Sequence, residues 1–158
     1  MRLYLMRHGS AEDMATSDHA RQLTSEGRED IRRMAKLVGN RGIRDAHIFA
    51  SPRTRAQQTA EIMAIALNSP VQTHEDVNFS FNLAALTALI AGLPPAAHVF
   101  FIGHNPSMSE VVSQLTGTGL GMKTGAIACI DLHTSQPRKG GMLLWYLYPK
   151  LLTSIVEI

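Results

Sequence analysis

The chain has 158 residues, a length that suits a single domain over residues 1–158 with one buried core. Apolar residues make up 45% and charged residues 18% of the chain, which argues against a disordered or fibrous protein. The formal charge of +2 is too small to indicate nucleic-acid binding, and no run of basic residues stands out.

The first third of the chain predicts a strand, a loop and an amphipathic helix. Residues 2–6 form a short apolar run that is typical of a buried strand. Residues 10–22 are polar and predict a loop. Thr24 is a candidate N-cap, and apolar residues recur at helical spacing over 31–38 before Gly39 ends the helix.

The next segment predicts a second buried strand over 46–50. Ser51 followed by Pro52 is a favoured pair at the cap and first position of a helix. We therefore expect a helix to begin there and to run to about Leu67. A short strand over 71–74 follows.

In the second half of the chain, predicted strands and helices continue to alternate. A helix is predicted over 83–91, a third buried strand over 98–102, and another helix from Pro106. Two closing strands, 126–132 and 142–148, have only a loop between them and suggest an antiparallel hairpin. Strands that alternate with helices predict an α/β fold, a three-layer α/β/α sandwich with a mainly parallel central sheet.

Several other classes of protein are disfavoured. Cys129 is the single cysteine, so no intrachain disulfide can form, and the seven histidines are too scattered to suggest a zinc site. No segment has the pattern of a signal peptide or the length of a membrane span. We expect a soluble cytoplasmic protein that does not bind membranes.

Polar motifs follow three of the predicted strands. In chain order they are Arg7-His8-Gly9, Ser51-Pro52-Arg53-Thr54-Arg55 and Gly103-His104-Asn105-Pro106. Because the carboxyl ends of parallel strands share one edge of a sheet, we expect two histidines and several arginines to meet in one crevice.

Phosphate is the ligand that this combination of residues favours. Arginine offers a planar fork of donors that matches phosphate oxygens, and helix N-termini after Ser51 and Asn105 would add backbone N–H groups. A neutral imidazole can attack phosphorus and form phosphohistidine. Neighbouring arginines favour the neutral imidazole, whereas bound phosphate opposes it.

These motifs resemble those of a known family. Residues 5–12 and 51–60, together with Gly103-His104-Asn105-Pro106, are similar in order and spacing to the signatures of the histidine phosphatase superfamily, which has a phosphoglycerate mutase-like fold. Residues 18–27 and 124–128 are most similar to the short, SixA-type phosphohistidine phosphatases. The chain is much shorter than the family's mutases.

The resemblance implies roles for four residues. His8 would be the nucleophile, Arg7 and Arg55 would hold the phosphoryl oxygens, and His104 would stabilise the transferred group. Arg53 lies two residues before Arg55, so on a helix the two would point to different faces. We assign the role to Arg55 because it matches the family motif.

Further candidates lie outside these four residues, and some of them have two interpretations. Arg21 and Asp18 form either an exposed ion pair or a border of the pocket, as the resemblance suggests. Asn105 either caps the helix beginning at Pro106 or contacts substrate. Thr124 is a candidate phosphate contact.

None of the matched motifs contains a general acid, the residue that would protonate the leaving group. Many family members place a Glu or Asp after the second motif, and here that stretch holds Glu75 and Asp76, outside any motif that aligns. Glu12 and Asp18 are equally unassigned. An alkoxide leaving group needs a proton from such an acid, whereas a protonated phosphoimidazole expels neutral imidazole without one. The gap therefore favours a phosphohistidine substrate.

Three functions remain open on the sequence. The first is a phosphatase acting on protein phosphohistidine, such as a histidine phosphotransfer domain. The second uses the same mechanism on a small phosphomonoester, a sugar phosphate or a nucleotide fragment. The third is a phosphate-binding module without turnover. No metal or organic cofactor is expected, since arginine and histidine supply the positive charge.

Overall fold

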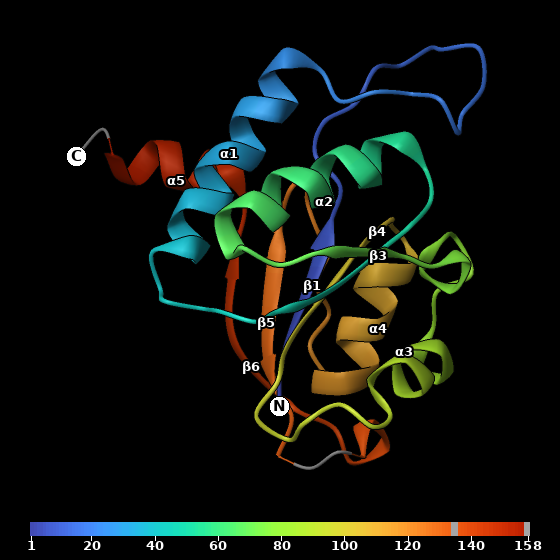
Figure 1. The fold of residues 1–158 in the computed structure, drawn as a ribbon, viewed down its shortest axis with the longest axis vertical. Coiled ribbons are helices and arrows are strands. Elements are labelled where there is room, and N and C mark those ends of the chain that lie inside the picture. The colour runs from blue at the N-terminus through green and yellow to red at the C-terminus, as the bar shows by residue number, and fades with distance from the viewer. Residues whose placement is uncertain (134–135, 157–158) are drawn as a thin grey trace.

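A computed structural model of the chain describes residues 1–133 and 136–156. Within them, one six-stranded sheet lies between layers of helices (Figure 1). The strands are β1 (Arg2–Arg7), β2 (His47–Ala50), β3 (Val71–Thr73), β4 (His98–Gly103), β5 (Ile127–Asp131) and β6 (Met142–Leu147). The helices are α1 (Ser25–Gly39), α2 (Thr54–Leu67), α3 (Leu83–Ile90), α4 (Ser107–Thr116) and α5 (Pro149–Val156), with short 3₁₀ turns η1 (Glu75–Val77) and η2 (Pro137–Lys139).

The strand order is β3-β2-β4-β1-β5-β6. β1, β2, β3 and β4 are mutually parallel, and β5 is antiparallel to both β1 and β6. This confirms the predicted α/β fold with a mainly parallel sheet and the closing antiparallel hairpin. β1, β4 and β2 are neighbours, so the three strands that precede the polar motifs lie together.

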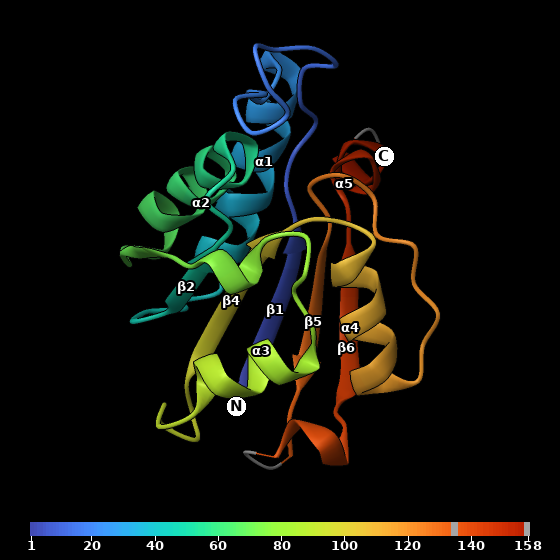
Figure 2. The ribbon, with the colours of Figure 1, turned by 90° about the vertical axis from the view of Figure 1, so that its right-hand side faces the viewer.

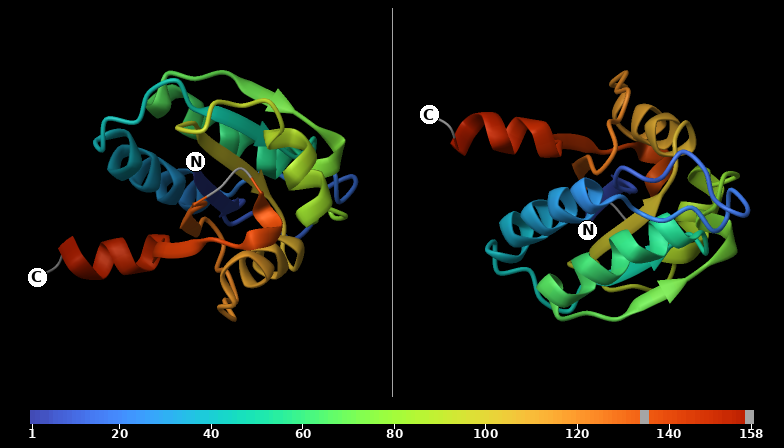
Figure 3. Two further views of the ribbon diagram at one scale, coloured as in Figure 1. Left: turned by 90° about the horizontal axis from the view of Figure 1, so that it is seen from below. Right: turned by 90° about the horizontal axis from the view of Figure 1, so that it is seen from above.

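Helices cover both faces of the sheet, as the views in Figure 2 and Figure 3 show. On β1, Leu3 and Leu5 point into the core beneath α3 and α4, whereas Tyr4 and Met6 point into the core beneath α1 and α2. All four side chains are buried. Both faces of the strand are therefore covered, which is why residues 2–6 form a continuous apolar run rather than an alternating one.

The segment between α4 and β5 sets the direction of the last two strands. After α4 the chain climbs back along the sheet to the carboxyl edge of β1 (Figure 2). There the backbone N–H of Arg7 donates to the carbonyl of Ala126, 3.1 Å away. β5 therefore starts at the edge where β1 ends, and it runs antiparallel to β1.

The predicted start of the second helix at Ser51 is wrong, because α2 begins at Thr54. Arg53 has extended backbone dihedrals and occupies the N-cap position. The Ser51 hydroxyl is bonded to His104 Nε2 at 2.8 Å, a contact with another strand end. The backbone N–H of Thr54 donates to the carbonyl of His19, so it is not free for an anion.

The helix α5 was not predicted. Residues 149–156 follow β6 directly, and Leu152 packs with Trp145 and Leu147 against the core beneath α1 and α2. Eight residues are too few for a stable isolated helix, so α5 depends on packing against the core. The local sequence alone therefore did not predict it. No helix in the described residues is long and apolar enough to cross a membrane.

The start of α1 fastens the loop 10–22 beside the carboxyl edge of the sheet. As predicted, Thr24 is the N-cap: its hydroxyl accepts from the backbone N–H of Gly27 at 2.9 Å. The backbone N–H of Thr24 in turn donates to the carbonyl of Ser10 at 3.0 Å. A Cβ on Gly27 would overlap that carbonyl oxygen, so the close approach of helix and loop requires glycine.

Candidate active site

Three neighbouring strand ends bring the predicted histidines together. His8 follows β1 and His104 follows β4, in the register that pairs Arg7 with Gly103. The two imidazole centroids are 5.3 Å apart. His8 is 8% exposed and His104 is 1% exposed, so both rings lie at the floor of the site.

The hydrogen bonds of His8 fix its tautomer. Its Nδ1 lies 2.7 Å from the carbonyl oxygen of Gly9, which can only accept, so Nδ1 carries the proton. The other nitrogen, Nε2, then keeps a lone pair. The Nε–H of Arg55 donates to it at 3.3 Å. His8 therefore presents an unprotonated nitrogen directly beside a guanidinium group.

Arg55 lies in the first turn of α2 and is 3% exposed. Its Nη1 donates to the backbone carbonyl of Asp18 at 2.9 Å, and its Nη2 lies 3.3 Å from the Asp18 carboxylate. The loop 10–22 thus reaches over the strand ends and holds the guanidinium at His8.

Arg53 also reaches this loop, because its Nη1 donates to the carboxylate of Asp18 at 2.6 Å. The prediction that Arg53 and Arg55 point to different faces is wrong. Arg53 is the extended N-cap residue rather than a helical one, so the helical spacing does not apply to it. A second contact, from its Nε to Asn78 Oδ1 at 2.9 Å, fixes the side chain in this direction.

Two buried nitrogen atoms of the predicted site have no hydrogen-bond partner within the described residues. They are Nδ1 of His104 and Nε of Arg7. The opposite edges of both side chains are bonded, His104 Nε2 to the Ser51 hydroxyl and Arg7 Nη1 to the Met122 carbonyl at 2.9 Å. Leaving a buried polar group unpaired costs about 1–3 kcal/mol, so these atoms are candidates to pair with an incoming anion.

Burial keeps both histidines neutral. Desolvation, helped by the charges of Arg55 and Arg7 and opposed by the hydrogen bond to Gly9, lowers the pKa of His8 from 6.5 to about 4. Desolvation, together with His8 and Arg55, lowers the pKa of His104 to about 3. The imidazole of His8 is therefore neutral at neutral pH and its Nε2 keeps a lone pair, the state that a nucleophile requires.

The lowered pKa values of His8 and His104 make the stability of the folded protein depend on pH. Between pH 6.5 and the folded-state values, the unfolded chain binds the protons that the folded chain excludes, so stability falls as pH falls. We expect His104 to contribute a loss on the order of 2 kcal/mol between pH 7.5 and pH 5. Urea unfolding of wild type and His104→Gln at both pH values measures this. The variant should lose about that much less than wild type, and equal losses would contradict the assignment.

Asp18 and Arg21 form a partly exposed ion pair, and Asp18 also contacts Arg55. Arg21 donates from Nη1 to the Asp18 carboxylate at 3.0 Å and from Nε to the carbonyl of Glu12 at 2.6 Å. Desolvation by itself raises the pKa of Asp18, but the bond from Arg21 and the charge of Arg55 outweigh it and lower the pKa. Asp18 is thus an anion at neutral pH and cannot donate a proton.

Asn105 does not cap a helix. Its amide nitrogen donates to the Met122 carbonyl at 2.9 Å, and its Oδ1 accepts from the hydroxyl of Ser109 at 2.8 Å. The cap position of α4 is Pro106, without a side-chain bond. Asn105 therefore ties α4 to the segment that also binds Arg7.

Thr124 lies on the same segment and shares a hydrogen bond of 3.1 Å with the hydroxyl of Ser10. Substrate contacts by Thr124, Asn105 and Arg21 stay predictions.

The candidate acids are engaged elsewhere. The Glu75 carboxylate accepts from the amide of Asn78 at 2.8 Å, and the Asp76 carboxylate lies 3.6 Å from His74. Glu12 accepts from the backbone N–H of Gln22 at 3.2 Å. None of these contacts is to either imidazole of the site.

Sequence reasoning missed three contributors to the site. Besides the Ser51 hydroxyl, Thr59 accepts from the backbone N–H of Gly9 at 3.1 Å and so braces the turn that carries His8. Phe79 lies beside His104, with ring centroids 4.7 Å apart. In the sequence, Phe79 lies in the same stretch as Glu75 and Asp76, where an apolar residue gives no signal of a catalytic acid.

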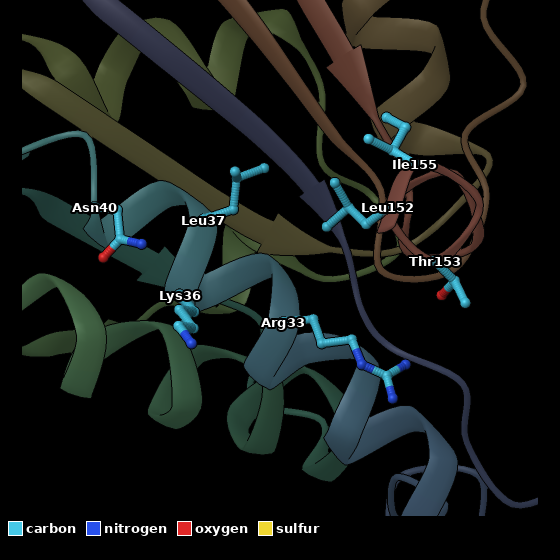
Figure 4. Close-up of a pocket in the computed structure, with 7 residues that line it drawn as sticks. All are labelled: Arg33, Lys36, Leu37, Asn40, Leu152, Thr153 and Ile155. Atoms are coloured by element: carbon cyan, nitrogen blue, oxygen red, sulfur yellow. The ribbon is translucent and has the colours of Figure 1, made fainter. Parts of the chain in front are cut away.

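A separate pocket lies between α1 and α5. Its lining is shown in Figure 4 and consists of Arg33, Lys36, Leu37, Asn40, Leu152, Thr153 and Ile155. None of them is a residue of the predicted site. Over residues 1–133 and 136–156, no group of three or more His, Cys, Asp or Glu residues is placed to hold a metal ion.

The three-layer fold and the site define an α/β protein in which two buried histidines lie beside arginine at the carboxyl edge of the sheet. The family model of the histidine phosphatase superfamily (branch 1) matches residues 3–78. The phosphohistidine phosphatase SixA of Escherichia coli (strain K12) is 29% identical over 155 residues, which cover 94% of each chain. An uncharacterized protein of Picosynechococcus sp. is 32% identical over 150 residues, 85% of this chain and 91% of that protein.

A solved structure extends the likeness to three dimensions. The protein histidine phosphatase SixA complexed with tungstate has a TM-score of 0.85 and 28% identity, covering 96% of this chain and 99% of that one. The chain belongs to the histidine phosphatase superfamily. The resemblance inferred from the motifs is confirmed, including its SixA-type character.

Proposed function

We propose that this protein is a phosphatase that removes the phosphoryl group from phosphohistidine on a protein, through a phosphorylated His8. One observation carries the proposal: His8 Nδ1 is bonded to the Gly9 carbonyl, so that the lone pair of Nε2 faces Arg55. A nucleophile with its proton fixed on the far nitrogen needs no separate base.

In the first step the Nε2 lone pair of His8 attacks phosphorus. The new Nε2–P bond forms as the P–N bond to the substrate ring breaks. That ring is protonated on its other nitrogen, so it leaves with the bonding electrons as neutral imidazole. Arg55 transfers its hydrogen bond from Nε2 to a phosphoryl oxygen, and Arg7 supplies a further donor from its unpaired Nε. With the Ser51 hydroxyl donating to Nε2 of His104, that ring carries its proton on the unpaired Nδ1 and donates from there. Such preorganised donors stabilise the charge that builds up on the oxygens.

In the second step water attacks the phosphorus of phospho-His8. The P–Nε2 bond breaks, its electrons return to Nε2, and inorganic phosphate leaves with the oxygen and protons of the water. The bond from Nδ1 to Gly9 holds the ring in one orientation through both steps. His8 is thereby regenerated in its starting tautomer.

The leaving group is the reason to favour phosphohistidine over a phosphomonoester. Asp18 is kept deprotonated by its arginines, and Glu75 is bonded to Asn78. A protonated phosphoimidazole releases neutral imidazole without help from an acid, whereas an alkoxide needs one. The name of the E. coli relative, phosphohistidine phosphatase SixA, supports the same substrate class.

Amide variants of the two candidate acids test this reading. We expect Glu75→Gln and Asp76→Asn to change kcat/KM on a phosphohistidine-bearing protein by less than about threefold, because general-acid catalysis would contribute about 10²–10⁴-fold. Steady-state kinetics on that protein and on a sugar phosphate measure it. A loss of about a hundredfold in either variant would show that the acid participates, and faster turnover of the sugar phosphate would favour the phosphomonoester alternative.

The partner that fits is a phosphorylated protein, such as a histidine phosphotransfer domain, whose phosphohistidine is presented on its surface. A cytoplasmic location fits the single thiol, which is buried and carries a pKa raised by desolvation to about 11. A thiol of this kind is inert.

A further inference from the structure

A half-exposed aromatic ring lines the candidate site. Phe79 is 50% exposed, although large apolar side chains are usually buried. Its ring centroid lies 4.7 Å from that of His104, and the guanidinium carbon of Arg55 is 5.8 Å from it. His104 and Arg55 also contact His8, so Phe79 lies next to two residues that surround the nucleophile.

The ring is held in place from behind. The backbone N–H of Phe79 and the Nε of Arg53 both donate to Oδ1 of Asn78, at 3.0 and 2.9 Å. The amide nitrogen of Asn78 donates to Glu75, which closes the turn η1. The guanidinium of Arg53 lies over one part of the ring, 4.0 Å from the centroid. Phe79 is therefore a fixed wall rather than a loose side chain.

The turn that carries Phe79 is also packed tightly against β4. A Cβ at Gly103 would lie 2.8 Å from the carbonyl oxygen of Val77, so the glycine allows the backbones to approach. Val77 itself is fully buried. This contact sets Phe79 next to the strand end that supplies His104.

We infer that Phe79 is the specificity-determining residue for the leaving group, and that it stacks against a planar aromatic ring attached to the phosphoryl group. Phosphohistidine presents such a ring, whereas a sugar phosphate, an alkyl phosphate or a phosphorylated lysine does not. Aromatic pairs gain energy in offset or edge-to-face arrangements beyond the area that they bury. An aromatic wall also supplies no proton, which agrees with a leaving group that needs none.

Two small substrates separate the effect of an aromatic leaving group from the effect of the P–N bond that is broken. N-phosphoimidazole and phosphoramidate both carry a phosphorus–nitrogen bond, but only the first has an aromatic leaving group. We expect wild type to favour N-phosphoimidazole, and Phe79→Leu to lower the ratio of the two kcat/KM values by roughly 3–10-fold. Phe79→Tyr, which keeps an aromatic ring, should have the same ratio of kcat/KM values as wild type.

The outcomes separate this inference from the proposed function on which it rests. If wild type turns over both substrates and the ratio is the same in Phe79→Leu, Phe79 does not select the leaving group, and only the inference is overturned. If wild type forms phospho-His8 from neither substrate, the proposed function is overturned and the inference with it. Thermal unfolding midpoints, compared between variants, identify a general loss of fold, which would lower both rates together and leave the ratio unchanged.

Discussion

In the His8→Asn variant we expect no phosphoenzyme and a fall in turnover of at least about 10³-fold on phosphohistidine. Asparagine can keep a donor near the Gly9 carbonyl, but it has no lone pair on a basic nitrogen to attack phosphorus. Labelled N-phosphoimidazole, mixed rapidly and quenched at alkaline pH, should place its label on His8 of wild type. Peptide mapping of the quenched protein identifies the labelled residue.

An exposed histidine provides the matched control. His133 lies on the turn after β5, with a side chain that is 63% exposed. His133→Asn should form the phosphoenzyme at the wild-type rate. Label retained at the wild-type level in His8→Asn would refute the assignment of the nucleophile, whatever the turnover.

For Arg55→Lys we expect a loss of roughly 10²–10³-fold in kcat/KM, the usual cost of removing one preorganised donor to a developing oxyanion. Lysine keeps the positive charge but lacks the planar fork. The fork lets Arg55 reach His8 Nε2 and Asp18 at the same time, through Nε and the two Nη atoms. A single ammonium cannot serve both positions. The variant should also form phospho-His8 more slowly, which rapid-quench kinetics measures.

Arg32 supplies the control for the arginine-to-lysine change. It lies on α1 with an exposed side chain, 3.5 Å from Glu29. Arg32→Lys should leave kcat/KM unchanged. A loss of less than tenfold in Arg55→Lys, with an unchanged unfolding midpoint, would mean that charge alone is sufficient at this position.

Within residues 1–133 and 136–156, no carboxyl group is hydrogen-bonded to the imidazole of His8 or His104. The pKa of Asp18 is lowered by Arg21 and Arg55, so this carboxylate orients the guanidinium groups in place of donating a proton. Catalysis then depends on positioned positive charge and a neutral imidazole. Replacing either one removes a contribution that no other described residue duplicates in the contacts around His8.

The sequence by itself determined the six strands, the helices α1 to α4 and the sheet edge at which the site lies. Continuous apolar runs predict strands buried on both faces, and such strands belong to a parallel sheet. The strand ends of a parallel sheet converge, so Arg7, His8, Arg55 and His104 could be assembled from their positions after strands. The N-cap at Thr24 could also be predicted, because Thr24 and Gly27 are close in the chain.

Only the tertiary structure decided which atoms meet. The hydroxyl of Ser51 bonds to His104 instead of opening a helix, Arg53 and Arg55 converge on Asp18, and Phe79 lies against His104. These partners are 25 to 53 residues apart in the chain. Local patterns encode secondary structure and residue type, whereas contacts at this separation depend on how distant elements pack, which no short stretch of sequence specifies.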